Sequence, residues 1–77
     1  VKEICDYGFY KCKNITNYYL SSSLEVIGEC AFSFNTSLSS INIPDNVIQI
    51  KKRAFSEDNN LNYIYYYLFL INHLYNK

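Results

Sequence analysis

The chain has few of the residues on which catalytic and metal sites are usually built. Its 77 residues include one histidine, two glycines, one proline, no tryptophan and no methionine. A metal site or a nucleophile with its base would have to use the single histidine, His73, near the C-terminal end of the chain, and two isolated glycines do not make a phosphate-binding loop. The sequence therefore predicts a protein that is not an enzyme and that uses no metal or cofactor.

An excess of charge of either sign is also missing. Lysine and arginine total 7, aspartate and glutamate total 7, and the formal net charge is zero. Binding to nucleic acid relies on a surplus of basic residues that neutralise phosphates. The longest apolar run, residues 63–71, has nine residues, whereas a membrane-spanning helix needs about 20. We therefore expect no nucleic-acid partner and no membrane span within this chain.

Cysteine is present in an odd number, at positions 5, 12 and 30. Three cysteines do not suggest a closed set of disulfides, and their spacing matches no zinc-binding pattern. A bond between Cys5 and Cys12 stays open at this point. Cys12 is better explained as a small buried apolar side chain.

The sequence does contain an internal repeat with a period of 23 residues. Phe9, Phe32 and Phe55 recur at this spacing, and a small residue precedes each of them. Such a period is the signature of stacked repeat units. It divides the chain into repeats 1–23, 24–46 and 47–69, followed by a degenerate tail, 70–77. Further apolar columns share the period: Val1/Leu24/Val47, Ile4/Ile27/Ile50, Ile15/Leu38/Leu61, Tyr18/Ile41/Ile64 and Leu20/Ile43/Tyr66.

Fixed apolar columns separated by variable polar ones predict a solenoid of about three coils. Residues 39–43 alternate polar and apolar and end at Pro44, which favours a short parallel β-strand, with equivalents at 17–20 and 63–66. A second extended piece is expected at 25–27 and 48–50. In the middle repeat, residues 28–34 lie between the piece at 25–27 and the strand at 39–43, and they suit a single helical or 3₁₀ turn.

Alternation along these strands predicts which side chains face outward. Tyrosine offers a rigid, amphipathic contact surface and is enriched in binding sites. The outward residues therefore form the predicted binding face, although a chain with nine tyrosines also places some of them on its surface without a function. The predicted face consists of Asn17, Tyr19, Ser40, Asn42, Tyr63 and Tyr65.

Two sequons, Asn14-Ile15-Thr16 and Asn35-Thr36-Ser37, lie in the segment between the Phe column and the first strand. This segment is expected to be exposed. Glycosylation of Asn14 and Asn35 is predicted on condition that the protein is secreted in a eukaryotic host. Because the chain is rich in asparagine and serine, chance sequons are the competing explanation.

The columns resemble the BspA-like leucine-rich repeat, whose pattern is approximately I-G-x-x-A-F-x-x-C-x-x-L-x-x-I-x-I-P-x-x-V-x-x-I. The resemblance covers about residues 1–66. Asn35 and Asp58 depart from it, because the family prefers cysteine there, as at Cys12. The matching residues of the middle repeat are Ile27, Gly28, Ala31, Phe32, Leu38, Ile41, Ile43, Pro44, Val47 and Ile50.

The resemblance implies a cell-surface or secreted protein that adheres to a protein ligand such as a host or matrix protein. It supplies no catalytic residues. The function expected from it is a non-catalytic protein-protein interaction or adhesion module. An intracellular repeat scaffold and a truncated, non-functional repeat fragment are the alternatives. Val1 begins in the middle of the pattern, so further repeats are expected upstream.

Overall fold

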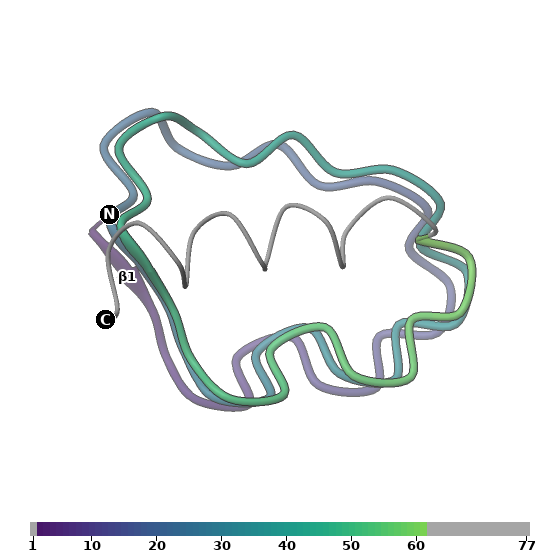
Figure 1. The fold of residues 1–77 in the computed structure, drawn as a ribbon. Coiled ribbons are helices and arrows are strands. Elements are labelled where there is room, and N and C mark those ends of the chain that lie inside the picture. The colour runs from purple at the N-terminus through teal and green to yellow at the C-terminus, as the bar shows by residue number, and fades with distance from the viewer. Residues whose placement is uncertain (1, 62–77) are drawn as a thin grey trace.

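The computed structural model describes residues 2–61. This part of the chain contains one short parallel sheet. Its strands are β1 (Glu3–Ile4), β2 (Val26–Ile27) and β3 (Gln49–Ile50), in the order β1-β2-β3. Ile4 pairs with Ile27, and Ile27 pairs with Ile50, so each partner lies 23 residues further along the chain. Successive turns of the chain therefore lie over one another, as Figure 1 shows along the stacking direction.

The sheet is built from the second extended piece of each repeat. Segments 17–20 and 39–43, which we expected to be the main strands, are extended but are not assigned as strands. Between them, the backbone NH of Ser39 donates to the carbonyl oxygen of Thr16 at 3.2 Å. The third predicted strand, 63–66, and the tail 70–77 lie outside the described residues. The parallel arrangement was predicted correctly, but its strands are at a different place in the repeat.

The predicted helical or 3₁₀ turns are wrong for residues 2–61, which contain no helix. Such turns require consecutive residues with negative φ. Each repeat instead places two residues, four positions apart, in the left-handed region with φ between 57° and 64°. Backbone NH groups then bond to the next coil, as from Phe32 to the carbonyl oxygen of Ala54 at 2.8 Å. The left-handed residues form two columns, Tyr7/Cys30/Arg53 and Lys11/Phe34/Glu57.

Replacing Glu57 with glycine is expected to stabilise the chain by about 0.5–1 kcal/mol. A left-handed φ disfavours a residue with a Cβ by about 1–2 kcal/mol, and the greater freedom of glycine in the unfolded chain offsets about 0.5–1 kcal/mol of that gain. Thermal denaturation measures the change. Ser56→Gly is the control, because Ser56 does not have a positive φ. A glycine that raises the melting temperature equally at both positions would contradict this explanation.

The core is a stack of aromatic rings surrounded by aliphatic columns. The ring of Phe32 lies 5.3 Å from that of Phe9 and 5.2 Å from that of Phe55, nearly parallel to both. Phe32 and Phe55 are buried, whereas Phe9 is 36% exposed and packs against one phenylalanine. The other buried members of the cluster are Ile4, Leu24, Ile27, Ala31, Leu38, Ile41, Val47, Ile50, Ala54 and Leu61.

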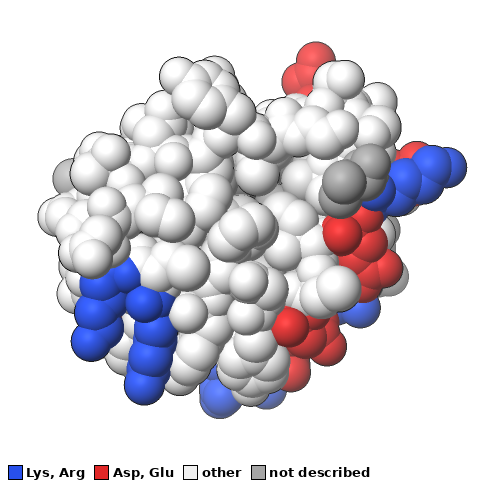
Figure 2. All heavy atoms as spheres, turned by 180° about the vertical axis from the view of Figure 1, so that it is seen from behind, with Lys and Arg blue, Asp and Glu red and all other residues white. Residues whose placement is uncertain are grey.

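No helix within residues 2–61 is long and apolar enough to cross a membrane. Charged side chains gather at the margins of the face seen in Figure 2, and a broad uncharged area lies between them. In the described part of the chain, one ion pair is present, between Lys51 and Glu3 at 3.8 Å. Both of its side chains are partly exposed and the distance is long, so its contribution to stability is small.

Candidate binding groove

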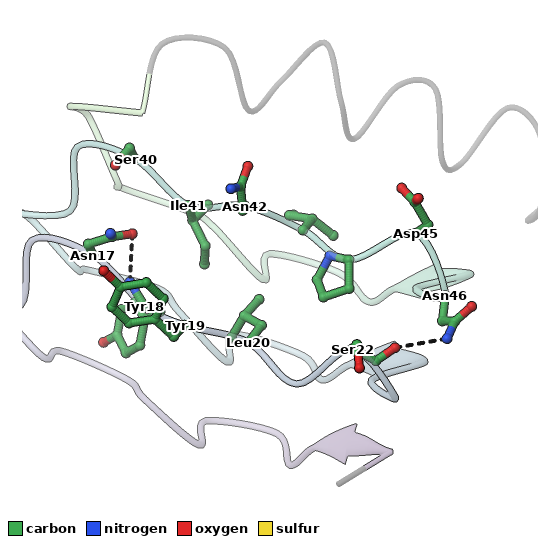
Figure 3. A pocket seen from close by; sticks show the side chains of 12 residues that line it. Asn17, Tyr18, Tyr19, Leu20, Ser22, Ser40, Ile41, Asn42, Asp45 and Asn46 are labelled. Atoms are coloured by element: carbon green, nitrogen blue, oxygen red, sulfur yellow. Dashed lines mark hydrogen bonds between the residues drawn. The ribbon is translucent and has the colours of Figure 1, made fainter.

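A groove of about 810 Å³ runs between the first and second coils, and we call it the inter-coil groove. Its walls come from two extended segments, one per repeat, and from the turn that follows Pro44 (Figure 3). Figure 1 shows that these segments lie along a different edge of the coil from β1. The lining residues are Asn17, Tyr18, Tyr19, Leu20, Ser22, Ser40, Ile41, Asn42, Ile43, Pro44, Asp45 and Asn46.

The groove combines an apolar floor with a polar rim. Leu20 and Ile43 are partly buried against the core, and Ile41 is buried within it. Ser40, Asn42 and other polar rim residues are exposed. This division follows from the alternation of side chains along an extended backbone. Apolar contact surface beside a few polar groups is the usual composition of a ligand-binding site.

Four of the six predicted binding residues line this groove. Asn17, Tyr19, Ser40 and Asn42 are all exposed, Tyr19 at 97%. The other two, Tyr63 and Tyr65, lie outside the described residues. The four share one surface as expected, but this surface is not the hydrogen-bonded sheet formed by β1–β3. Their role in binding remains a prediction.

The predicted binding face did not include the turn at residues 44–46, which closes one end of the groove. The side-chain amide nitrogen of Asn46 donates to the carbonyl oxygen of Ser22 at 2.8 Å and so links the two coils. Asp45 is the single charged residue among the groove's lining residues, and it is exposed. The composition of Pro44-Asp45-Asn46 indicates a turn directly after the predicted strand. The bond to Ser22 depends on the stacking of the two coils, so the sequence did not show that this turn borders the groove.

The prediction that Asn35 carries a glycan conflicts with its position in the fold. Asn35 is fully buried. Its amide nitrogen donates to the carbonyl oxygens of Phe9 at 2.9 Å and Phe32 at 2.8 Å, and its Oδ1 accepts the hydroxyl of Tyr18 at 2.5 Å. A sugar on that nitrogen would break these bonds and has no space. Asn14 is exposed, and its glycosylation remains a prediction.

The three cysteines are not joined by a disulfide bond. Cys5 is exposed, Cys12 is half-buried and Cys30 is buried, and all three are free thiols. Cys5 and Cys12 are therefore unpaired in this fold. Within residues 2–61, no group of three or more histidine, cysteine, aspartate or glutamate side chains could hold a metal ion.

A smaller cleft of about 330 Å³ lies beside a cluster of exposed aromatic rings. Tyr10 makes edge-to-face contacts with Tyr7 at 5.2 Å and with Phe34 at 5.8 Å. The ammonium group of Lys11 lies 5.4 Å from the centre of the Tyr10 ring. Sequence reasoning did not find this cluster, because Tyr7 and Tyr10 lie outside the predicted strands. Their positions in the sequence, on either side of Phe9, could have indicated that they lie near the Phe column.

Comparison with known proteins gives two matches. A family model described as the BspA type leucine rich repeat region (6 copies) matches residues 1–74. The crystal structure of the T. pallidum leucine-rich repeat protein superposes on the chain with a TM-score of 0.77 at 34% sequence identity. That match covers 79% of this chain and 28% of the treponemal chain, so this chain spans just over a quarter of the other's length. No curated protein sequence matches the chain.

Proposed function

The chain belongs to the BspA type leucine-rich repeat family, and from this premise we propose that it is a non-catalytic protein-binding and adhesion module of a cell-surface or secreted protein. Leucine-rich repeats are generally non-enzymatic and typically bind proteins. Stacked repeats are suited to this role because they create an extended surface whose variable positions can change without loss of the core.

The observation that carries the proposal is the inter-coil groove. Tyr19 is 97% exposed at its edge, so its ring contributes little to the stability of the fold. Leu20, Ile43 and Pro44 provide apolar surface that is partly open to solvent. Burying an aromatic side chain and adjacent apolar surface is the main source of affinity in protein interfaces. The host or matrix protein implied by the family resemblance is our proposed ligand class.

The second candidate is an intracellular scaffold with the same architecture. It is favoured by one observation, the three free thiols, because disulfides form mainly in oxidising compartments outside the cytosol. Proteolysis of intact cells separates the two locations. A full-length protein that is cleaved from outside is exposed at the surface, whereas protection until lysis supports the scaffold.

Binding is tested with the chain and immobilised extracellular-matrix proteins in a surface plasmon resonance measurement. Tyr19→Ser is expected to weaken capture about 5- to 30-fold, the usual effect of removing an aromatic contact residue. The melting temperature should stay unchanged because Tyr19 is almost fully exposed.

The matched control is Tyr7→Ser, which removes another exposed tyrosine, 54% accessible, outside the inter-coil groove. The control should bind as the unmodified chain does. Equal binding by the Tyr19→Ser variant would exclude the groove, and the absence of any capture by the unmodified chain would argue against the proposed ligand class.

A further inference from the structure

Asp58 has a buried carboxylate oxygen without a hydrogen-bond partner. The residue is fully buried. Its Oδ1 accepts the backbone NH of Asn35 at 2.7 Å, and its Oδ2 has no hydrogen-bond partner among residues 2–61. An ionised oxygen that is buried without a donor is strongly unfavourable. The arrangement therefore requires a physical explanation.

The explanation comes from the equivalent residue of the preceding coil. Asn35 lies 23 residues before Asp58, and its amide nitrogen donates to the carbonyl oxygens of Phe9 and Phe32. By the 23-residue register, the carbonyl oxygens of Phe32 and Phe55 are, for Asp58, the counterparts of the two that Asn35 binds. Asparagine has hydrogens to donate at this position, whereas an ionised carboxylate presents only another acceptor. A proton on Oδ2 would let Asp58 make the bonds that Asn35 makes.

Within residues 2–61, burial and the hydrogen bond from the Asn35 backbone set the pKa of Asp58, and no basic side chain contributes. In the second coil the neighbour is the neutral amide of Asn35. In the first coil the nearby titratable groups are Cys12 and Tyr18, and burial together with Cys12 raises the pKa of Tyr18, so its hydroxyl keeps its proton. Among residues 2–61, the one ion pair joins Lys51 to Glu3 and does not involve Asp58.

We propose that Asp58 is a proton-binding site that couples the packing of the third coil to pH. Protonated Asp58 continues the side-chain ladder begun by Asn35. Ionised Asp58 places a negative charge among backbone carbonyl oxygens and loosens the contact between the second and third coils. The inference goes beyond the proposed binding role and does not depend on it.

The direction of the pH effect follows from the environment of the carboxyl group. Burial raises the pKa of Asp58 from 3.8 to about 7, although the hydrogen bond from the Asn35 backbone opposes this rise. The folded chain therefore binds the proton more tightly than the unfolded chain. The resulting stability is complete below the unfolded pKa of 3.8 and is lost as pH rises through about 7.

Chemical unfolding of the 77-residue chain at pH 5 and pH 8 tests the proposal. The folding equilibrium constant should fall about 10- to 100-fold between these values, as expected for one linked proton. Asp58→Asn, which copies Asn35, should remove this dependence and stabilise the chain at pH 8. Glu57→Gln is the control, because Glu57 is the exposed neighbour, and it should keep the dependence.

Two results would overturn the proposal: equal stability of the unmodified chain at both pH values, or the same pH dependence in the Asp58→Asn variant. If that variant does not fold, the carbon-13 shift of the Asp58 carboxyl group in the unmodified chain decides. Titration near pH 7 supports the proton site, and titration completed below pH 5 refutes it.

Discussion

Replacing Phe32 with alanine is expected to lower the free energy of unfolding by about 3–5 kcal/mol. The side chain is fully buried. Its ring stacks between Phe9 and Phe55 and meets the Tyr18 ring edge-to-face at 4.8 Å. Truncation removes these contacts and leaves a cavity that the backbone-paired coils close only in part. Denaturant unfolding followed by circular dichroism measures the loss.

The control for this prediction is Phe9→Ala in the same column. Phe9 is 36% exposed and stacks on one phenylalanine rather than two, so its truncation should cost clearly less. Equal losses at both positions would show that the stack is not centred on Phe32. If the Phe32→Ala chain does not fold, Phe32→Leu retains part of the volume and should still be less stable than the unmodified chain.

Replacing Gly28 with alanine should destabilise the chain by about 1–3 kcal/mol, the usual range for overpacking. A Cβ at this position would lie 2.6 Å from the backbone nitrogen of Asp6 and 2.6 Å from the carbonyl oxygen of Ile4. Both atoms belong to the backbone of the first coil, so rotating a side chain cannot relieve the clash. The two coils would have to separate beside β1 and β2. Thermal denaturation measures this effect.

Gly8→Ala is the matched control. A Cβ at Gly8 would meet the carbonyl oxygen of Cys5 and the Cγ2 of Ile4 at 3.0 Å, which is tight but less severe. Ala31 and Ala54 occupy the equivalent positions of the next two repeats and are buried there. The control should therefore lose much less stability. A similar loss in both variants would mean that the close approach at Gly28 is not what limits the packing of the coils.

The sequence by itself determined the register of the fold. Ile27, Phe32 and Leu38 recur with the 23-residue period, and all three are buried. The reason is that a stacked repeat buries the same position in every coil, so the core is recorded in the sequence as a period. The exposed positions of the groove, such as Asn17 and Asn42, followed from alternation around the same buried residues.

Only the tertiary structure decided where the backbone hydrogen bonds lie and how the chain turns. Two extended pieces per repeat satisfied the strand pattern, and the structure forms its sheet at 26–27 and not at 39–43. The left-handed turns include Tyr7 and Phe34, residue types that do not signal a positive φ. Bonds to the next coil hold these turns, so the local sequence cannot reveal them.

Asn35 illustrates the same division most clearly. The sequence showed a sequon and a departure from the cysteine of the family pattern. The fold places its amide against the carbonyl oxygens of Phe9 and Phe32 and its Oδ1 against Tyr18. Tyr18 is 17 residues and Phe9 is 26 residues from Asn35 in the sequence. Both reach Asn35 only when the coils are stacked. The period and the buried positions can be read from the sequence, whereas the bonds of Asn35 to Tyr18 and Phe9 form only when the repeats stack.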